Sequence, residues 1–211
     1  MEGVKSLIRF WPLHRKCVYL SDRNFRFMDI DKAYLDRFEN RMQDEMLKVC
    51  TSKDMLDGVL LSGEDIDGLW KVLAPEYVAD AVVQVQDYPV VSLAWAAYLG
   101  MAVAYGWDAD WAVYSKKSYQ SYYGQEGYDD MDEHIVRDLL GLALDGDEAI
   151  RLADVLRSCA QSGISLIRHE GIEPQSPLAF HVFARACRVM FRIGAAIQLR
   201  RMGYKFEKVD L

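Results

Sequence analysis

The stretch YPVVSLAWAAYLGMAVAY, residues 88–105, decides the fold class of this 211-residue chain. It lies within the longest run without a charged residue, and its 18 residues bring it to the lower limit of a membrane-spanning helix. Its surroundings argue against a membrane, because Asp87, Asp108 and Asp110 lie around it and no cluster of Lys or Arg does. We therefore expect a helix buried at the centre of a globular domain, with a membrane span as the weaker alternative.

Small side chains recur every four residues along this segment. Ser92, Ala96, Gly100 and Ala104 therefore lie on one side of the expected helix. Because bulky side chains are missing from that side, the backbone of a second helix can come close to it. The segment thus predicts a central helix and a tight helix–helix crossing against it.

Apolar residues at helical spacing and helix-start signals predict further helices before and after this segment. Asp31 is the expected N-cap of the first helix, and Ser176 followed by Pro177 marks the start of the last. Pro75 is expected in the first turn of a separate short helix. The expected helices cover residues 32–50, two short segments within 62–85, then 89–105, 107–123, 130–145, 147–170 and 177–201.

These helices define an all-α fold, an irregular bundle of about seven helices in a single domain that covers residues 1–211. Two segments near the N-terminus, KCVYL at 16–20 and NFRFMDI at 24–30, have the aromatic and β-branched content of a small β-hairpin. We expect residues 1–30 to be irregular or to form that hairpin. They should pack on the helical bundle, because a lone hairpin is only marginally stable.

The composition is that of an ordinary globular protein, with 51% hydrophobic and 27% charged residues. The net charge of −7 argues against general nucleic-acid binding. The charge is uneven, since residues 1–27 carry six Lys or Arg against two Asp or Glu, and residues 185–211 carry seven against two. These basic ends either form a basic face or pair with the acidic middle of the chain, and we favour the pairing.

Cysteine usage and the N-terminal sequence indicate a cytoplasmic protein. Cys17, Cys50, Cys159 and Cys187 are far apart in sequence and form no CxxC pair, as expected for reduced and partly buried thiols. The first residues hold only a very short apolar stretch between basic residues, which predicts no secretory signal peptide. We therefore expect a cytoplasmic location without association with a membrane.

No motif of a known enzyme class stands in the sequence. It contains no GxGxxG, GxxxxGK[ST], HExxH or GxSxG motif, and it lacks the ExxH repeats of di-iron carboxylate bundles. The sequence therefore leaves the question of enzymatic activity open, favours a non-enzymatic role and predicts no cofactor.

The last expected helix carries a narrow basic stripe on an otherwise apolar surface. The stripe consists of His181, Arg185, Arg188 and Arg192, which fall on one side of the helix. If the stripe faces solvent through a cleft between helices, these groups can bind a phosphate or a carboxylate. Otherwise the arginines need carboxylates from neighbouring helices, because a buried unpaired Arg is costly, and we favour this pairing. The candidate partners are Asp80, Asp138 and Asp154.

Eight Tyr and Trp residues crowd into residues 105–128. Among them, Trp107, Trp111 and Tyr114 have the i, i+4, i+7 spacing of one helical face. Tyr and Trp combine apolar area with a polar group, which suits protein interfaces and ligand clefts. The other interpretation is core packing, which we favour. The partner-surface interpretation fails if Tyr119, Tyr122 and Tyr123 are all fully buried.

One acidic segment is a weak candidate for a metal site. Asp130, His134 and Asp138 recur every four residues on one helical face. The three residues span too many turns to reach one ion, so a second helix would have to supply ligands. We favour a negatively charged helix start, which the helix dipole stabilises, and we predict no metal.

The expected function is a non-enzymatic protein-interaction or adaptor module that binds a protein, either a second copy of the chain or another protein. The alternative is a small-molecule or anion sensor, in which the basic stripe and the aromatic residues line one cleft. An enzyme of unrecognised type is the second alternative, and it requires two titratable groups within reach of each other in a pocket.

Overall fold

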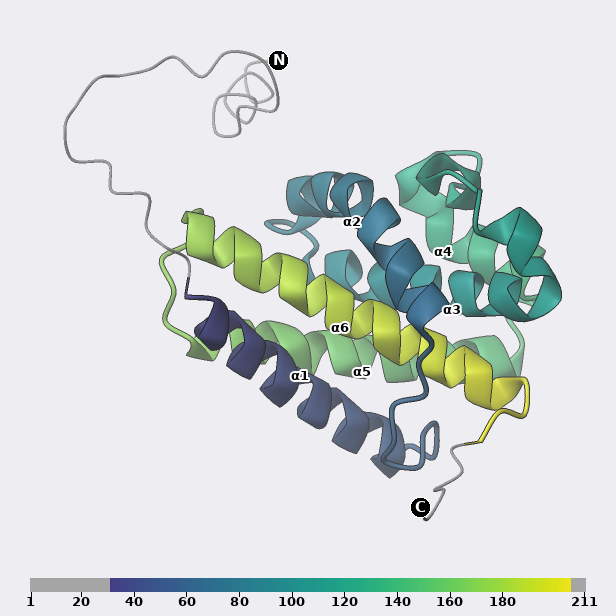
Figure 1. Ribbon diagram of the computed structural model, residues 1–211, viewed down its shortest axis with the longest axis horizontal. Coiled ribbons are helices and arrows are strands. Elements are labelled where there is room, and N and C mark those ends of the chain that lie inside the picture. The colour runs from purple at the N-terminus through teal and green to yellow at the C-terminus, as the bar shows by residue number, and fades with distance from the viewer. Residues whose placement is uncertain (1–30, 206–211) are drawn as a thin grey trace. The chain divides into compact units, whose positions relative to one another are not determined.

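The structure is a computed structural model that describes residues 31–205, and within this range the fold is all-α and contains no strand. The expected N-terminal hairpin, and the packing of residues 1–30 on the bundle, lie outside the described residues. The five long helices are α1 (Lys32–Ser52), α2 (Glu64–Gln84), α3 (Pro89–Tyr114), α5 (Asp147–His169) and α6 (Pro177–Arg201) (Figure 1). Short helical turns connect α3 to α5, namely η2 (Tyr119–Tyr122), η3 (Tyr128–Asp130), α4 (Met131–His134) and η4 (Ile135–Leu139).

The predicted starts of the first and last helices are confirmed. Asp31 caps α1, because its carboxylate accepts a hydrogen bond of 3.0 Å from the backbone N–H of Tyr34. Ser176 caps α6 in the same way through the N–H of Ala179, at 3.1 Å, and Pro177 occupies the first turn. The caps fix where these two helices begin, and so which of their residues face the core.

The described residues form six α-helices, so the expected count of about seven is not confirmed, and two predicted interruptions differ from the structure. The first is Pro75, which lies inside α2 and does not open a new helix. A proline in a helix interior removes one backbone hydrogen bond. Leu73 and Tyr77 on either side of it are fully buried, and their packing keeps α2 continuous.

The second predicted interruption is displaced: α3 continues past Tyr105 and is broken at Asp110, before a short helical piece that ends at Tyr114. Within α3 only Asp110 departs from helical geometry, with a φ of −165° and a ψ of 88°. Its carboxylate accepts a hydrogen bond of 3.2 Å from the N–H of Val113, so the turn after the interruption is capped. The expected helix over 107–123 is therefore the end of α3, a short loop and the turn η2.

The acidic segment forms a shorter helix than predicted. Its α-helical turn α4 passes directly into the π-helical turn η4, which ends at Leu139. Gly141 then adopts a φ of +67°, which glycine reaches without steric cost, and the helix stops well before residue 145. Gly146 serves instead as the N-cap of α5.

The core is organised around a close crossing of α3 and α6, which pack on each other at the centre of the bundle (Figure 1). A Cβ atom on Gly100 would lie 1.9 Å from the carbonyl oxygen of Phe191. A Cβ atom on Gly194 would lie equally close, 1.9 Å, to the carbonyl oxygen of Ala97. The tight crossing predicted from the small side chains of α3 is therefore confirmed. Helix α6 contributes a glycine, Gly194, to the same crossing. The small residues of α3 are all buried: Ser92, Ala96, Gly100 and Ala104.

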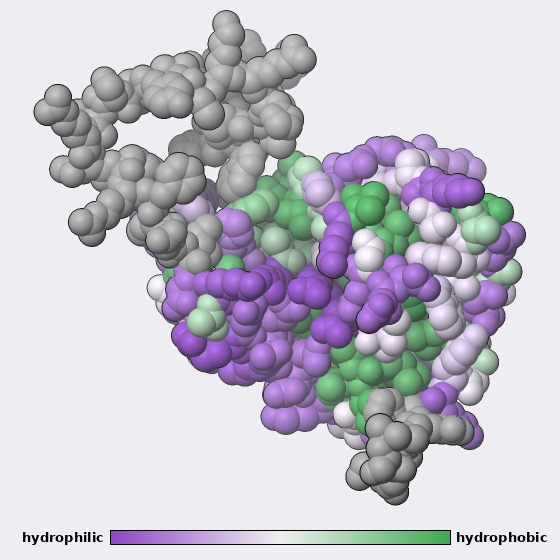
Figure 2. Space-filling view, viewed as in Figure 1, coloured by the Kyte–Doolittle hydropathy of each residue, from purple (hydrophilic) through white to green (hydrophobic). Residues whose placement is uncertain are grey.

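Helices α1 and α5 pack beside α6 and complete the bundle (Figure 1). The outward side of α1 is hydrophilic (Figure 2). Its inward face buries Leu35, Phe38, Met42 and Met46 at helical spacing. The hydrophobic pattern of α1 thus matches its position at the surface of the bundle.

Among residues 31–205, α3 alone is long and apolar enough to cross a membrane by length and composition. However, 78% of its most apolar window is buried by the rest of the fold. The core helix of a soluble protein meets the same criteria, so α3 is weak evidence for a membrane span.

Candidate functional site

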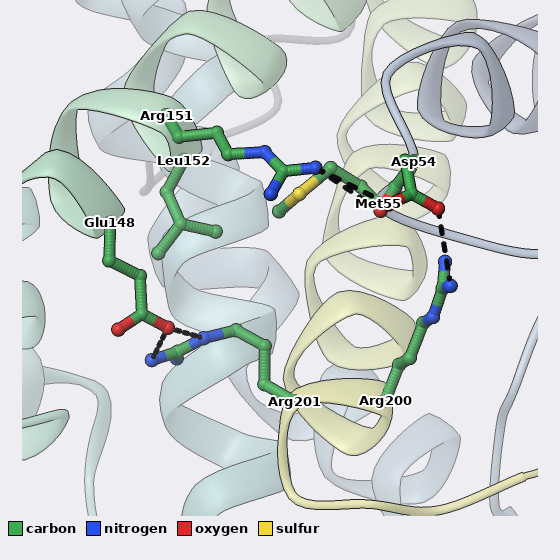
Figure 3. A pocket seen from close by; sticks show the side chains of 7 residues that line it. All are labelled: Asp54, Met55, Glu148, Arg151, Leu152, Arg200 and Arg201. Carbon is green, nitrogen blue, oxygen red and sulfur yellow. Dashed lines mark hydrogen bonds and ion pairs between the residues drawn. The ribbon is translucent and has the colours of Figure 1, made fainter.

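A small cavity lies where the end of α6, the start of α5 and the connection between α1 and α2 meet (Figure 3). Its volume is about 230 Å³. Three arginines, two carboxylates and two apolar side chains line it. They are Asp54, Met55, Glu148, Arg151, Leu152, Arg200 and Arg201.

The last turn of α6 supplies two of the arginines, which extend toward different partners (Figure 3). Arg201 reaches Glu148 on α5, with its Nη2 2.7 Å and its Nε 2.9 Å from one carboxylate oxygen. Arg200 reaches the α1–α2 connection, where its Nη2 lies 2.8 Å from Asp57 and 3.6 Å from Asp54. The end of α6 thus brings two guanidinium groups to the same cavity from one helical turn.

Arg151 forms the third side of the cavity from the start of α5. Its Nη2 donates to the backbone carbonyl oxygens of Lys53, at 3.0 Å, and Asp54, at 3.4 Å. Both carbonyls directly follow α1, where backbone acceptors have no partner within the helix. Asp54 itself has a φ of +56°, which Asp and Asn adopt more readily than other side chains. Arg151 therefore helps to hold the backbone of the connection in place.

The arginines are more enclosed than the carboxylates that pair with them. The side chain of Arg200 is 29% exposed, whereas those of Asp54 and Asp57 are 85% and 75% exposed. In addition, Nη1 of Arg200 is buried and has no hydrogen-bond partner among the described residues. A buried charged donor without a partner is costly. Nη1 of Arg200 is therefore an unused donor, which an acceptor in the cavity can meet only if the side chain turns this nitrogen out of its buried position.

The electrostatic balance of the cavity is close to neutral, because Asp54, Asp57 and Glu148 face the three arginines. The N-terminus of α5 adds a partial positive charge, since Gly146 gives its first turn no side-chain cap. All three carboxylates lie mostly toward solvent. An external anion can therefore take the place of an exposed carboxylate beside the more enclosed guanidinium groups of Arg200 and Arg201.

The basic stripe predicted on α6 is paired with carboxylates. Arg185 donates a hydrogen bond to Glu39 and lies 3.1 Å from Asp36. Arg188 lies 3.2 Å from the other carboxylate oxygen of Glu39. Because Glu39 is only 6% exposed, it bridges two arginines within the contact between α1 and α6.

The remaining members of the stripe also have neighbours inside the fold. Arg192 lies 3.3 Å from Asp67 on α2 and donates a hydrogen bond of 2.8 Å to Gln43 on α1. His181 is half-buried, and its ring centre is 5.6 Å from that of Phe180. These contacts favour the interpretation that the stripe attaches α6 to α1 and α2.

The carboxylates that pair with the stripe are not those suggested from the sequence. Asp80, Asp138 and Asp154 interact with Tyr or Arg side chains elsewhere in the fold. The partners come instead from α1 and α2, because these helices pack on the polar side of α6. The sequence of α6 shows that its arginines need carboxylate partners. It does not show which helices pack against α6, and therefore does not identify those carboxylates.

The aromatic residues at the end of α3 do not share one face as predicted, because the helix is interrupted at Asp110. Trp107, before the interruption, packs against Tyr204 with ring centres 5.7 Å apart. Tyr114, after it, folds back onto Gly106, where an added Cβ atom would lie 2.1 Å from the ring. Trp111 is half-buried. The three candidate residues therefore have different surroundings.

The tyrosines of η2 belong to the core. Tyr119 and Tyr122 are buried, and Tyr123 is half-buried and donates a hydrogen bond to Asp80. The ring centre of Tyr119 lies 6.2 Å from that of Tyr77. Burial raises the pKa of Tyr122 to about 12. Tyr119 and Tyr122 are buried, which favours core packing, but Tyr123 is half-buried, so the condition that would exclude a partner surface is not met.

Only two of the three candidate metal ligands of the acidic segment lie in contact with each other. His134 Nδ1 lies 2.9 Å from an oxygen of Asp138. Asp130 instead accepts a hydrogen bond of 3.1 Å from the N–H of Glu126. Within residues 31–205, no group of three His, Cys, Asp or Glu side chains is placed to hold a metal ion. Arg137, and then His134, lowers the pKa of Asp138 to about 2.

Sequence reasoning did not single out the cavity arginines. Arg200 and Arg201 stand in the basic C-terminal region, but about two helical turns beyond the end of the stripe at Arg192. Arg151 belongs to no periodic pattern. No known protein family, curated protein or solved structure matches this chain.

Proposed function

We propose that this domain is a non-enzymatic binding module for a small anion, held in the cavity of Arg151, Arg200 and Arg201. The observation that carries the proposal is the buried Nη1 of Arg200, which lacks a hydrogen-bond partner in the described part of the chain. A phosphate or carboxylate oxygen suits such a donor, because charge-assisted hydrogen bonds from Arg are short and strong. The proposal develops the anion-sensor alternative, with other arginines than those of the stripe.

The size of the cavity limits the ligand. Its volume of about 230 Å³ is below the range of about 300–1,000 Å³ that is typical of sites for drug-sized ligands. A nucleotide is too large, whereas a phosphate ion or a small phosphomonoester has a suitable size. Because phosphate has several acceptor oxygens, it can contact more than one arginine at a time. We therefore propose phosphate-type ligands.

Binding requires that the ligand displace carboxylates already paired with the arginines. Asp54 and Asp57 are highly exposed, and surface ion pairs contribute only about 0–1 kcal/mol each. Their release therefore costs little, and it frees Arg200 to turn Nη1, which is buried in this structure, toward the phosphate. In this proposal the two aspartates compete with the ligand for the same guanidinium group.

The lining supports binding rather than catalysis. None of the seven lining residues is a Ser, Thr, Cys, His, Tyr or Lys. Nucleophilic and acid–base catalysis need an activated nucleophile and a base within hydrogen-bond reach. The carboxylates of Asp54 and Glu148 are paired with arginines, which does not suit either role.

Isothermal titration calorimetry of the full chain with inorganic phosphate, at constant ionic strength, tests the proposal. We expect saturable binding to one site. Arg200→Gln should weaken it roughly 10-fold or more, because a hydrogen bond to a charged group is lost. Arg157→Gln is the matched control, since Arg157 is an exposed arginine of α5 that does not line the cavity. If phosphate does not bind, or binds equally well to the Arg200 variant, the proposal is wrong.

A second candidate function is the protein-interaction module expected from the sequence. One observation favours it: Val72 and Val83 are each 67% exposed on α2, and their spacing of eleven residues places them on one side of the helix. Figure 2 shows hydrophobic surface over α2. We propose this face as a contact with a second copy of the chain. Sedimentation velocity should then show a dimer that Val83→Glu abolishes, and a monomer at all accessible concentrations would exclude it.

A further inference from the structure

Two buried cysteines lie next to each other between α1 and α5. The Sγ atoms of Cys50 and Cys159 are 3.6 Å apart, and both side chains are fully enclosed. We propose that this pair is an oxidation site, in which a two-electron oxidant of the peroxide class joins the two thiols in a disulfide. This site does not depend on the anion-binding proposal.

The geometry requires only a small movement. A disulfide has an S–S distance of about 2.0 Å, so the two sulfur atoms must approach each other by about 1.6 Å. Rotations about the Cα–Cβ bonds of both residues can move the two sulfur atoms toward each other. The two helices already pack against each other, and the two sulfur atoms are in contact.

The contact between the two thiols makes them chemically different. Hydrogen bonding with Cys159 lowers the pKa of Cys50, whereas the same contact and burial raise the pKa of Cys159. Thiolate is the reactive form of cysteine. Cys50 is therefore the side chain that attacks the oxidant, and Cys159 is the one that resolves the intermediate.

The reaction consists of two steps and balances with one molecule of hydrogen peroxide. The Cys50 thiolate attacks a peroxide oxygen, the O–O bond breaks, and water leaves after proton uptake, which gives a sulfenic acid. The sulfur of Cys159 then attacks the Cys50 sulfur, the S–O bond breaks, and a second water leaves with the proton of Cys159. Two thiols are oxidised, and peroxide is reduced to two waters.

The oxidant reaches the pair through the end of α1. Cys50 stands in the last turn of α1, two residues before its end at Ser52. Helix ends open more readily than helix interiors. The carbonyl of Cys50 accepts a hydrogen bond of 2.8 Å from the N–H of Met55, so this opening also loosens the connection after α1. We therefore expect oxidation that is slower than for an exposed thiol but complete in the folded protein.

Peptide mapping of the full chain under non-reducing conditions tests the inference. The folded protein is treated with hydrogen peroxide, free thiols are alkylated, and peptides are analysed by mass spectrometry. We expect a linked pair of peptides containing Cys50 and Cys159, about 2 Da lighter than their sum, which separates on addition of dithiothreitol. Cys17→Ser and Cys187→Ser are matched controls and should leave the link intact.

A second readout keeps the test independent of the variants. The disulfide closes a long segment of chain and restricts the unfolded state, so the oxidised wild type should melt at a higher temperature, and dithiothreitol should reverse the shift. Alkylation of both Cys50 and Cys159 after peroxide treatment would overturn the inference. A link from either one to another cysteine, or sulfinic acid at Cys50 without a link, would overturn it equally.

Discussion

The crossing of α3 and α6 predicts that a single methyl group destabilises the fold. In Gly100→Ala the new Cβ atom would lie 1.9 Å from the carbonyl oxygen of Phe191 and 3.0 Å from the backbone nitrogen of Ala195. Carbon normally keeps about 3.5 Å from its neighbours, so the two backbones must separate by about 1.5 Å. Overpacking of a core costs about 1–3 kcal/mol or more. Because backbone atoms cannot rotate away, we expect the upper end of that range.

One effect opposes this loss. Alanine is favoured over glycine within a helix by about 1 kcal/mol, so the net decrease in the free energy of unfolding should be about 2 kcal/mol. For a chain of this size, such a decrease lowers the melting temperature by roughly 4–8 °C. Gly194→Ala meets Ala97 in the same way and should lose a similar amount.

Urea unfolding followed by circular dichroism measures this change. Gly68→Ala is the matched control, because Gly68 lies within α2 and a Cβ atom there would meet nothing within 4 Å. The control should be as stable as the wild type or up to about 1 kcal/mol more stable. A Gly100→Ala protein with wild-type stability would refute the proposed crossing.

Two further predictions concern buried polar groups. Glu39→Ala leaves Arg185 and Arg188 without their shared partner and should lower the free energy of unfolding by about 2–3 kcal/mol. The control Glu45→Ala, on the surface of α1, should change it by less than about 0.5 kcal/mol. Equal effects of the two variants in urea unfolding would contradict the bridging role of Glu39. Burial raises the pKa of Tyr122 to about 12, above about 10 in the unfolded chain. The stabilisation of the folded state by the neutral Tyr122 hydroxyl is thus fully present below about pH 10 and is lost as the pH rises toward 12. Tyr122→Phe should show a shallower loss of stability above about pH 10, and parallel stability curves for variant and wild type would contradict this.

Local chemistry determined the parts of the fold that the sequence predicts well. The caps at Asp31 and Ser176 depend on a single side chain and its own helix start, and both are confirmed. The small-residue side of α3 predicts the close crossing, because only a close neighbour can fill it. The interruptions depend on more distant contacts. Pro75 favours a boundary by itself, and the buried residues around it override this preference.

The candidate site was less predictable from the sequence, because it too depends on contacts between distant parts of the chain. The stripe on α6 required partners, but Glu39 could only be identified once α1 was known to pack on α6. The cavity joins Arg151, Arg200 and Asp54 from three separate parts of the chain. No periodic pattern connects these residues, and only the packing of the three segments brings them together.

The most direct test of the anion-binding account is the dissociation constant for phosphate of the Asp57→Asn protein. Asp57 is exposed and pairs with Arg200 at 2.8 Å, so its replacement removes a competing negative charge and leaves the guanidinium group in place. The account predicts tighter phosphate binding than in the wild type, opposite in direction to Arg200→Gln. Unchanged or weaker binding by the Asp57→Asn protein would show that the arginines of the cavity serve its ion pairs and do not bind an external anion.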